Sequence, residues 1–579
     1  MQPKSRLTLF LAQAFFLSQT LTGAYATTPD PAMEGKLAIP HDDVVMQAMK
    51  DELDRTKTKL KLEKFTTPYF VSYNITDSIG LYLGASFGAI TNKSEANSRY
   101  ARTVLRIGDK KLDSDRGSSF MFGDRSFVLD DDYDAIRNAL WLSSDRSYKS
   151  AVENLESKKA TRQYTKVEDQ PDSFSDAKMV VSVKDVKNTP IDQADWEDRL
   201  RKISAIFKEY PDITQSGISF STRKKLRRLI NSEGTTVKDQ EAGANFRIEA
   251  TAQAKDGMET SDDETFAVNS LDQLPDQKTM EESARKVASR AIELSKAKRA
   301  SDYLGPILFE KDAAADLVSS VISPLVVADR ADDIGYFRSS QSDKKIGQRL
   351  FPEFLSITDD PTAKTYKDLP LKGGWEIDDE GVRAQKLTLI DKGILKAVCS
   401  TRKPTRLSKE SNGHNRGGTA CPGHLFIETS QPMSVSDMKK KLIETAKAQG
   451  LTNALIIRKT QSGYMGIDFS GVSGLQILSS LGGSRSSSSF IYSVDVNTGK
   501  EELVRGAQLR RLTRQDLRNM LAAGNDANTY VAKYPSDYTG TAISLVTPSL
   551  LFGELEIQKP PLETETPPHL KNPYFDEKK

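Results

Sequence analysis

Apolar positions recur with two different periods along this chain, which predicts strands and helices mixed over its whole length. The clearest unit lies at residues 303–328, where the apolar run 304–309 predicts a strand and residues 312–322 carry apolar side chains at helical spacing. Pro324 lacks a backbone donor and ends this helix. We place the junction between two domains at this strand and helix.

The same patterns predict the other elements of both halves. Helices are predicted at 42–64, 130–142, 147–159, 196–210, 281–298 and 435–449, the last entered at Ser434. Strands of the first half are predicted at 68–73, 80–89, 99–107, 235–240 and 245–254. Residues 213–221 and 225–231 are interpreted as a hairpin, followed by a turn at 231–234. Strands of the second half are predicted at 354–359, 384–390, 394–400, 425–428, 453–458, 489–496, 542–546 and 552–557. This mixture predicts an α+β fold with two mixed domains.

The two ends of the chain differ from the globular part. Lys4 and Arg6 precede an apolar run at 7–21, and Ala24-Tyr25-Ala26 has the small-x-small pattern of a cleavage site. We therefore expect residues 1–26 to be a signal peptide cleaved after Ala26, and the mature protein to be periplasmic or secreted. The run is too short for a stable membrane span. Residues 27–300 and 301–559 form the two expected domains, and the proline-rich residues 560–579 form a tail.

Net charge argues against an electrostatic partner. The sequence holds 82 basic and 80 acidic residues, and loss of Lys4 and Arg6 with the signal peptide makes these numbers equal. A neutral protein has no global attraction to nucleic acid or acidic lipid. We expect neither as a partner.

Soft metal ligands are few and lie close together in the sequence. Cys399, His414, Cys421 and His424 could form a tetrahedral zinc site, and a dyad of Cys421 with either histidine is a further alternative. The outer ligands are more scattered than in structural zinc sites, which favours a Cys399–Cys421 disulfide in an oxidising compartment. Both histidines are otherwise interpreted as ordinary loop and strand residues.

Five acidic residues stand in two short groups and could act as paired carboxylates or bind a divalent ion. They are Asp359, Asp360, Asp378, Asp379 and Glu380. Proline and glycine neighbours indicate turns, in which aspartate side chains bind nearby backbone groups. We favour the turn interpretation.

The strand and helix at 303–328 resemble the start of the C-terminal domain in the TldD/PmbA family of zinc-metallopeptidase-like proteins. The turn at 231–234 and the segments 357–361, 378–381, 393–396, 411–416, 504–506, 524–526 and 547–551 are similar to family landmarks in the same order. In TldD-type members the helix carries His-Glu-x-x-x-His, which here aligns with Ser319, Ser320 and Pro324. Serine and proline cannot replace these zinc ligands and the base, and residues 461–489 lack the family's cysteine ligand. The resemblance implies the fold without the zinc site.

The resemblance also implies a partner and a binding loop. Family members are dimers, some of which pair with a zinc-less subunit, and enclose a groove for unfolded peptide. The loop 411–418 lies near this groove in the family, so Asn412, His414 and Arg416 are the predicted substrate-binding residues.

Three hypotheses therefore stand, and the third is a homodimeric envelope protein without a peptide role. In the first, the chain needs no cofactor and binds peptide as a homodimer, or serves as the non-catalytic partner of a TldD-like subunit. In the second, it is a peptidase that uses a divergent Cys/His-based or zinc site.

Overall fold

The structure is a computed structural model that describes residues 40–575, except 41, 63, 116–123, 165–170, 187–189, 329–345, 461–488, 511, 513, 534–541, 560–567, 569 and 571. Both the expected signal peptide and the segment 461–488 lie outside the described residues. Helices and strands are mixed in both halves, which confirms the predicted α+β fold.

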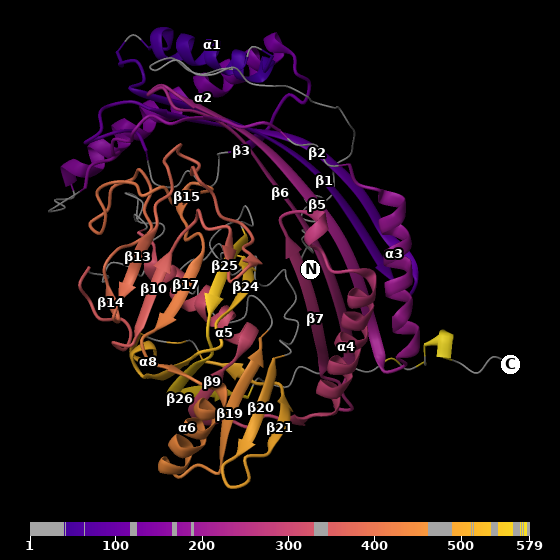
Figure 1. Ribbon diagram of the computed structural model, residues 1–579. Coiled ribbons are helices and arrows are strands. Elements are labelled where there is room, and N and C mark those ends of the chain that lie inside the picture. Colours follow the sequence, from indigo (N-terminus) through magenta and orange to yellow (C-terminus); the bar gives the residue numbers. More distant parts are fainter. Residues whose placement is uncertain are drawn as a thin grey trace, which may run out of the picture.

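Four long antiparallel strands form the centre of the first half. They are β1 (Phe70–Ser86), β2 (Ala89–Arg106), β5 (Ile213–Asn231) and β6 (Thr236–Gln253). The sheet has the order β3-β2-β1-β5-β6-β4, and β7 (Glu259–Val268) also pairs with β6. Its short edge strands are β3 (Asp124–Ser126) and β4 (Val181–Val183). Figure 1 shows this sheet curving over the second half.

The predicted hairpin at 213–231 is wrong, because β5 is one continuous strand. Thr222, at the expected turn, pairs with Leu81 of β1 on one side and with Ala244 of β6 on the other. The ladder is made by backbone groups, so a polar stretch in mid-strand does not interrupt it. For the same reason the strands predicted at 68–73 and 80–89 are parts of β1, and those at 235–240 and 245–254 are parts of β6.

Helices cover the face of this sheet that is turned away from the second half (Figure 1). They are α1 (Val44–Lys59), α2 (Tyr133–Tyr164), α3 (Gln193–Ala205) and α4 (Gln277–Lys296), with short helices η1 (Ile206–Glu209) and η2 (Leu271–Gln273). The two helices predicted at 130–142 and 147–159 are the single helix α2. Trp196 of α3 stacks on Phe220 of β5, with ring centroids 3.8 Å apart. No described helix is long and apolar enough to span a bilayer.

The second half contains two larger sheets. One has the order β14-β13-β10-β17-β25-β24 and the other the order β18-β23-β26-β9-β19-β20-β21-β8, with β22 paired to β26. The first sheet consists of β10 (Leu355–Asp359), β13 (Leu387–Asp391), β14 (Ile394–Leu395), β17 (Leu425–Thr429), β24 (Asn528–Lys533) and β25 (Ala542–Thr547). The second consists of β8 (Lys298–Arg299), β9 (Tyr303–Phe309), β18 (Pro432–Met433), β19 (Asn453–Lys459), β20 (Phe490–Asp495), β21 (Glu501–Arg505), β22 (Gln508–Leu509), β23 (Met520–Gly524) and β26 (Leu550–Gln558). Two small hairpins are β11 (Thr365–Tyr366) with β12 (Leu369–Pro370), and β15 (Asn415–Arg416) with β16 (Thr419–Ala420).

The main core of the second half lies between these two sheets and includes α5 (Lys311–Leu317). This helix widens into the π-helix η3 (Val318–Ile322) and ends in the 3₁₀ turn η4 (Ser323–Val326), which contains Pro324. Helix α6 (Val435–Ala448) begins at Ser434 as predicted and covers the other face of the nine-stranded sheet. The remaining short helices are α8 (Arg514–Arg518) and η5 (Pro573–Phe575).

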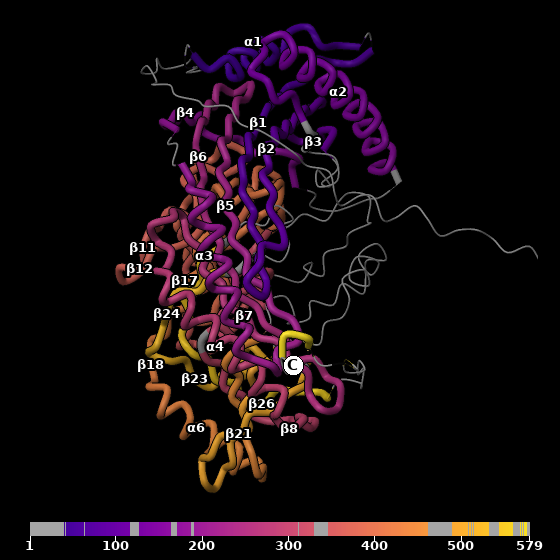
Figure 2. The backbone as a smooth tube through the Cα atoms, turned by 90° about the vertical axis from the view of Figure 1, so that its right-hand side faces the viewer, coloured from indigo at the N-terminus to yellow at the C-terminus, as the bar shows by residue number. Residues whose placement is uncertain are grey.

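Buried arginines join the two halves. Arg402, in a loop of the second half, binds Glu233 at 2.7 Å and the Ser175 carbonyl oxygen at 2.7 Å, both in the first half. Arg416 binds Glu241 at 2.7 Å. Figure 2 shows the first-half sheet lying along one side of the second half, with α1 and α2 at one end and α6 at the other. The loop 399–418 therefore takes part in the contact between the halves.

Candidate functional site

The helix that aligns with the family's zinc motif uses its hydroxyl groups within the helix itself. Ser320 donates to the Asp316 carbonyl oxygen at 2.6 Å, and Ser323 donates to the Val318 carbonyl oxygen at 3.2 Å. Ser319 is buried, and residues 311–326 contain no histidine, cysteine or glutamate. Such bonds from serine to a preceding carbonyl are a local alternative to the regular helix ladder. This stretch has the chemistry of a structural helix end.

Two carboxyl groups that the sequence analysis missed lie one turn apart on α5. Burial raises the pKa of Asp316 to about 7, a hydrogen bond from Thr460 opposes this, and the charge of Asp312 adds to it. Lys459 also lowers the pKa of Asp316, and its ammonium group binds Asp262 of β7 at 2.7 Å. In the sequence, the four-residue spacing of Asp312 and Asp316 was the signal that these two carboxyl groups lie together on a helix. Their partners on β7 lie about 50 residues away in the sequence and gave none.

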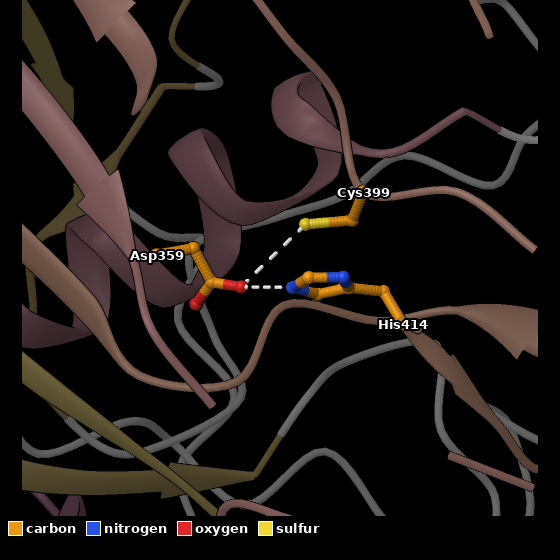
Figure 3. A group of neighbouring side chains, drawn as sticks. All are labelled: Asp359, Cys399 and His414. Atoms are coloured by element: carbon orange, nitrogen blue, oxygen red, sulfur yellow. Dashed lines mark hydrogen bonds and ion pairs between the residues drawn. The ribbon is translucent and has the colours of Figure 1, made fainter. Parts of the chain in front are cut away.

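A second cluster consists of Asp359, Cys399 and His414, all fully buried (Figure 3). Nε2 of His414 lies 2.6 Å from Oδ2 of Asp359, and Sγ of Cys399 lies 3.8 Å from the same oxygen. Asp359 is the last residue of β10, where its two carboxylate oxygens also accept from the Gly423 amide at 3.0 and 3.2 Å. The structure thus brings together Cys399 and His414, as one alternative predicted, around an aspartate that was interpreted as a turn residue.

Hydrogen bonding and burial determine the tautomer of His414 and the state of the Cys399 thiol. Nδ1 of His414 faces the Asn412 carbonyl oxygen at 2.9 Å, and a carbonyl only accepts, so Nδ1 carries a proton. Nε2 lies within hydrogen-bond distance of the Asp359 carboxyl group. Burial and the negative charge of Asp359 raise the pKa of the Cys399 thiol well above its usual value. Without a metal, Cys399 is therefore a neutral thiol and not a nucleophile.

Cys421 and His424 lie next to this cluster in the chain but outside the group of mutually close donor atoms. Both cysteines are buried free thiols in the structure, and the Cys399–Cys421 disulfide stays a prediction. His424 is fully buried, and neither of its ring nitrogens has a hydrogen-bond partner of normal geometry among the described residues. Burial lowers its pKa to about 4, against the opposing charge of Asp359. His424 is therefore a neutral core histidine at physiological pH.

The three predicted substrate-binding residues are engaged inside the protein. The Asn412 side chain accepts from the Ser400 amide and donates to the Val398 carbonyl oxygen, both at 2.8 Å. Arg416 is buried and binds Asp379 at 3.1 Å as well as Glu241. These contacts hold the loop to its surroundings, and a direct role in substrate binding stays a prediction.

The turn interpretation agrees with the contacts of Asp360 and Asp378, whereas Asp379 pairs with Arg227 and Arg416. Oδ1 of Asp378 accepts from the Glu380 and Val382 amides at 2.9 Å, and Oδ2 accepts from the Asn415 amide at 3.0 Å. Asp360 accepts from the Thr362 amide at 3.1 Å. These side chains stabilise local backbone.

Comparisons with known proteins give similarity over much of the chain. Residues 187–298 match the PmbA/TldA metallopeptidase central domain, and residues 302–559 match the PmbA/TldA metallopeptidase C-terminal domain. A metalloprotease of Methanothermobacter thermautotrophicus is 22% identical over 208 residues, which is 35% of this chain and 43% of that protein. The metalloprotease MJ0996 of Methanocaldococcus jannaschii is 26% identical over 134 residues, 23% of this chain and 28% of that protein. The aligned regions thus span less than half of either relative.

A solved structure extends the similarity to the whole fold. The crystal structure of TldE from Thermococcus kodakarensis superimposes with a TM-score of 0.53 at 14% identity, and covers 88% of this chain and all of that one. At this identity the likeness concerns the fold alone.

Proposed function

Because the chain belongs to the TldD/PmbA family, we propose that it is a member without the family's metallopeptidase centre, which binds extended peptide and does not cleave it. The observation that carries this proposal is the helix end at residues 317–326. The Ser320 and Ser323 hydroxyls bind carbonyl oxygens of the same helix, and no histidine, cysteine or glutamate is present there. Hydrolysis by a zinc-bound water needs both zinc ligands and a base.

The alternative of a divergent peptidase site has less support. The Asp359–Cys399–His414 cluster is closed to solvent, with all three residues at 0% exposure, so a peptide bond cannot approach it in this conformation. His414 also faces the Asn412 carbonyl oxygen and Asp359, and so has no free nitrogen to activate the Cys399 thiol.

A strand edge beside α5 offers a place for an extended peptide. Strand β24 is the last strand of its sheet, so one row of its backbone donors and acceptors is free of a neighbouring strand in the described part of the chain. Val531 on this strand is 45% exposed. The charges of Asp312 on α5 and of Asp526 contribute to the raised pKa of Tyr530, which places these groups near β24. Backbone pairing at such an edge binds peptide with little demand on its sequence.

The test combines binding with cleavage. A fluorescently labelled unfolded peptide is titrated with the protein, anisotropy reports binding, and mass spectrometry of the same sample reports cleavage. We expect binding, an intact peptide, and at least about tenfold weaker binding by Val531→Lys, since a charge on an edge strand disfavours pairing. Val44→Lys is the matched control, because Val44 is 39% exposed on α1 and away from this edge. Cleavage that persists in repurified protein would refute the proposal.

The non-catalytic role also implies a partner subunit. The resemblance to a family in which some members pair with a zinc-less subunit supports pairing with a TldD-like chain, with a homodimer as the other outcome. Light scattering after gel filtration, alone and with a co-expressed TldD-like subunit, distinguishes the two. A monomer under both conditions would argue against either assembly.

The proposal also includes export of the protein after cleavage of a signal peptide. The basic, apolar and small-residue pattern of residues 1–26 supports cleavage after Ala26 and a periplasmic or secreted mature protein. The intact mass of protein from the cell envelope or medium tests this directly, and an uncleaved, intracellular chain would contradict it.

A further inference from the structure

Asp359 differs in its partners from the buried carboxylates that form ion pairs. Asp43, Asp113 and Asp262 each contact an arginine or lysine nitrogen at 2.6–2.7 Å, whereas the equally buried Asp378 accepts from backbone amides. Asp359 instead faces an imidazole, a thiol and a backbone amide. A buried carboxylate is costly without a compensating charge. A bound metal cation would supply that charge.

The three side chains provide the donor atoms that zinc prefers. The carboxylate oxygen, Sγ of Cys399 and Nε2 of His414 all lie within 4.8 Å of one another, and Figure 3 shows the three side chains pointing at a common centre. They come from three separate segments of the chain, and each is fully buried. Nitrogen, oxygen and thiolate ligands together are typical of zinc and other first-row ions.

Backbone pairing places Cys421 opposite His414, but its Sγ contacts the Pro422 carbonyl oxygen at 3.3 Å and must turn to become the fourth donor. Asn415 pairs with Ala420 in the β15–β16 hairpin, and the Cys421 amide donates to the His414 carbonyl oxygen at 2.8 Å. His414 and Cys421 are thus the next opposed pair of this hairpin, and side chains of an opposed pair lie on one face with Cβ atoms about 5 Å apart. In agreement, charge on Cys421 is one cause that raises the pKa of the Cys399 thiol.

We propose that Asp359, Cys399, His414 and Cys421 bind one zinc-class transition-metal ion in a closed, structural site. In a tetrahedron with N and O ligands at about 2.0–2.1 Å and S at about 2.3 Å, N and O are about 3.3 Å apart and S and O about 3.6 Å apart. The observed 3.8 Å between Sγ and Oδ2 is near this value, and the 2.6 Å between Nε2 and Oδ2 must widen by about 0.7 Å. The two thiols lose their protons to solvent when the ion binds, and Nε2 of His414 and the Asp359 carboxylate bind the ion through their lone pairs.

The site would link the six-stranded sheet of the second half, which contains β10, to the contact between the halves. Asp359 ends β10, Cys399 lies three residues before Arg402, and His414 lies two residues before Arg416. Both arginines bind carboxylates of the first half. Metal binding therefore fixes the loop that carries these arginines. The metal site is separate from the proposed peptide-binding edge, because none of its ligands lies on β24.

The first experiment uses the full mature protein without substitutions. Reduced, metal-free protein is titrated with Co²⁺, followed by Zn²⁺, and the spectrum is recorded. We expect one equivalent of Co²⁺ to give visible bands of tetrahedral cobalt and a thiolate-to-cobalt charge-transfer band in the near ultraviolet, both removed by Zn²⁺. Cadmium bound at the same site should show a ¹¹³Cd resonance in the range of two sulfur ligands. Absence of stoichiometric binding, or a resonance without sulfur, would overturn the proposal.

Matched variants then assign the ligands. Cys399→Ser and His414→Asn should weaken cobalt binding by more than about 100-fold, because even outer-shell substitutions cost 10–100-fold. His424→Asn is the control, since His424 is an equally buried histidine outside the donor group. Unchanged binding in both ligand variants would overturn the assignment. If a variant does not fold, the unfolding temperature of the unsubstituted protein decides: it must fall with a chelator and recover with Zn²⁺.

The disulfide hypothesis gives a separate outcome. Intact mass under non-reducing conditions shows whether Cys399 and Cys421 are oxidised to a disulfide. A metal site requires both thiolates, so oxidised protein must lose cobalt binding and reduced protein must regain it. Equal binding in both forms would overturn the proposal.

Discussion

Asp379 should stabilise the contact between the two halves through its charge. Its Oδ1 accepts from Arg227 at 2.9 Å and from Arg416 at 3.1 Å, and its Oδ2 accepts from the Gly417 amide at 2.8 Å. The neighbouring Arg416 and Arg227 charges outweigh the effect of burial and lower the pKa of Asp379 to about 2. The substitution Asp379→Asn keeps the size of the side chain and removes the charge.

The expected loss of stability is about 2–3 kcal/mol at pH 7. A pKa lowered from about 3.9 in the unfolded chain to about 2 corresponds to roughly 2.6 kcal/mol, at 1.36 kcal/mol per pKa unit. Removal of one partner from a buried ion pair costs about 3–5 kcal/mol. The lower end applies here, because Arg227 keeps Asp239 at 2.6 Å and Arg416 keeps Glu241 at 2.7 Å.

The pH dependence has a definite sign. Asp379 has a lowered pKa in the folded state, so its contribution is complete above about pH 5 and is lost as the pH falls from about 4 to about 2. The unfolding free energies of wild type and Asp379→Asn should therefore differ by about 2–3 kcal/mol at pH 7 and converge towards pH 2. In urea unfolding followed by tryptophan fluorescence, the two midpoints should converge likewise.

The control for this prediction is Asp198→Asn. Asp198 also pairs with an arginine, but its side chain is 70% exposed, so the expected change is below about 1 kcal/mol. Equal stability of Asp379→Asn and wild type at pH 7 would refute the reasoning. So would a difference that stays the same between pH 7 and pH 2, because it would then be steric and not electrostatic.

Three further predictions concern α5, α3 and α6. Ser319→Ala and Ser320→Ala should leave peptide affinity within twofold of wild type in the anisotropy assay, and a loss above tenfold would show that the alignment with the zinc motif is wrong. Trp196→Ala should destabilise the protein by about 3–5 kcal/mol in urea unfolding, since the ring is buried and stacked on Phe220; a loss below 1 kcal/mol would contradict this. Ser434→Ala should cost about 0.5–2 kcal/mol, because the hydroxyl accepts from the Asp437 amide at the start of α6, and no change would exclude a capping role.

Local signals in the sequence were sufficient for elements whose ends are set by nearby residues. Helix α6 begins after Ser434 because the Ser434 hydroxyl accepts a hydrogen bond from the amide of Asp437, which is only three residues away in the sequence. The turn at 231–234 is likewise formed by its own residues, as Asn231 accepts from the Glu233 and Thr235 amides. The long strands could not be predicted in this way. Thr222 lies in the middle of β5 because it pairs with Leu81 and Ala244, and both of these residues lie far away in the sequence.

The candidate sites show the same limit. Asp359 is followed by Asp360 and Pro361, which are typical of a turn, and nothing near it indicates His414, which lies 55 residues later. Cys399 and His414 were recognised as donors from residue type alone. Their common partner could be found only from the register of β10 with β17, which brings Asp359 opposite Leu425 and so next to the Gly423 amide.

The candidate metal ligands lie away from the exposed strand edge, so an ion bound by them cannot both hold the fold together and act on a peptide at that edge. Helix α5 and η3 lie beside an exposed strand edge but carry no histidine, cysteine or glutamate. The cysteine and histidine ligands gather instead at a fully buried point between β10 and the β15–β16 hairpin. A metal at that point has no open position for water or substrate, so it can contribute only by holding the loop between residues 399 and 424. This loop carries Arg402 and Arg416 to the first half, and the geometry of the contact between the halves therefore depends on it.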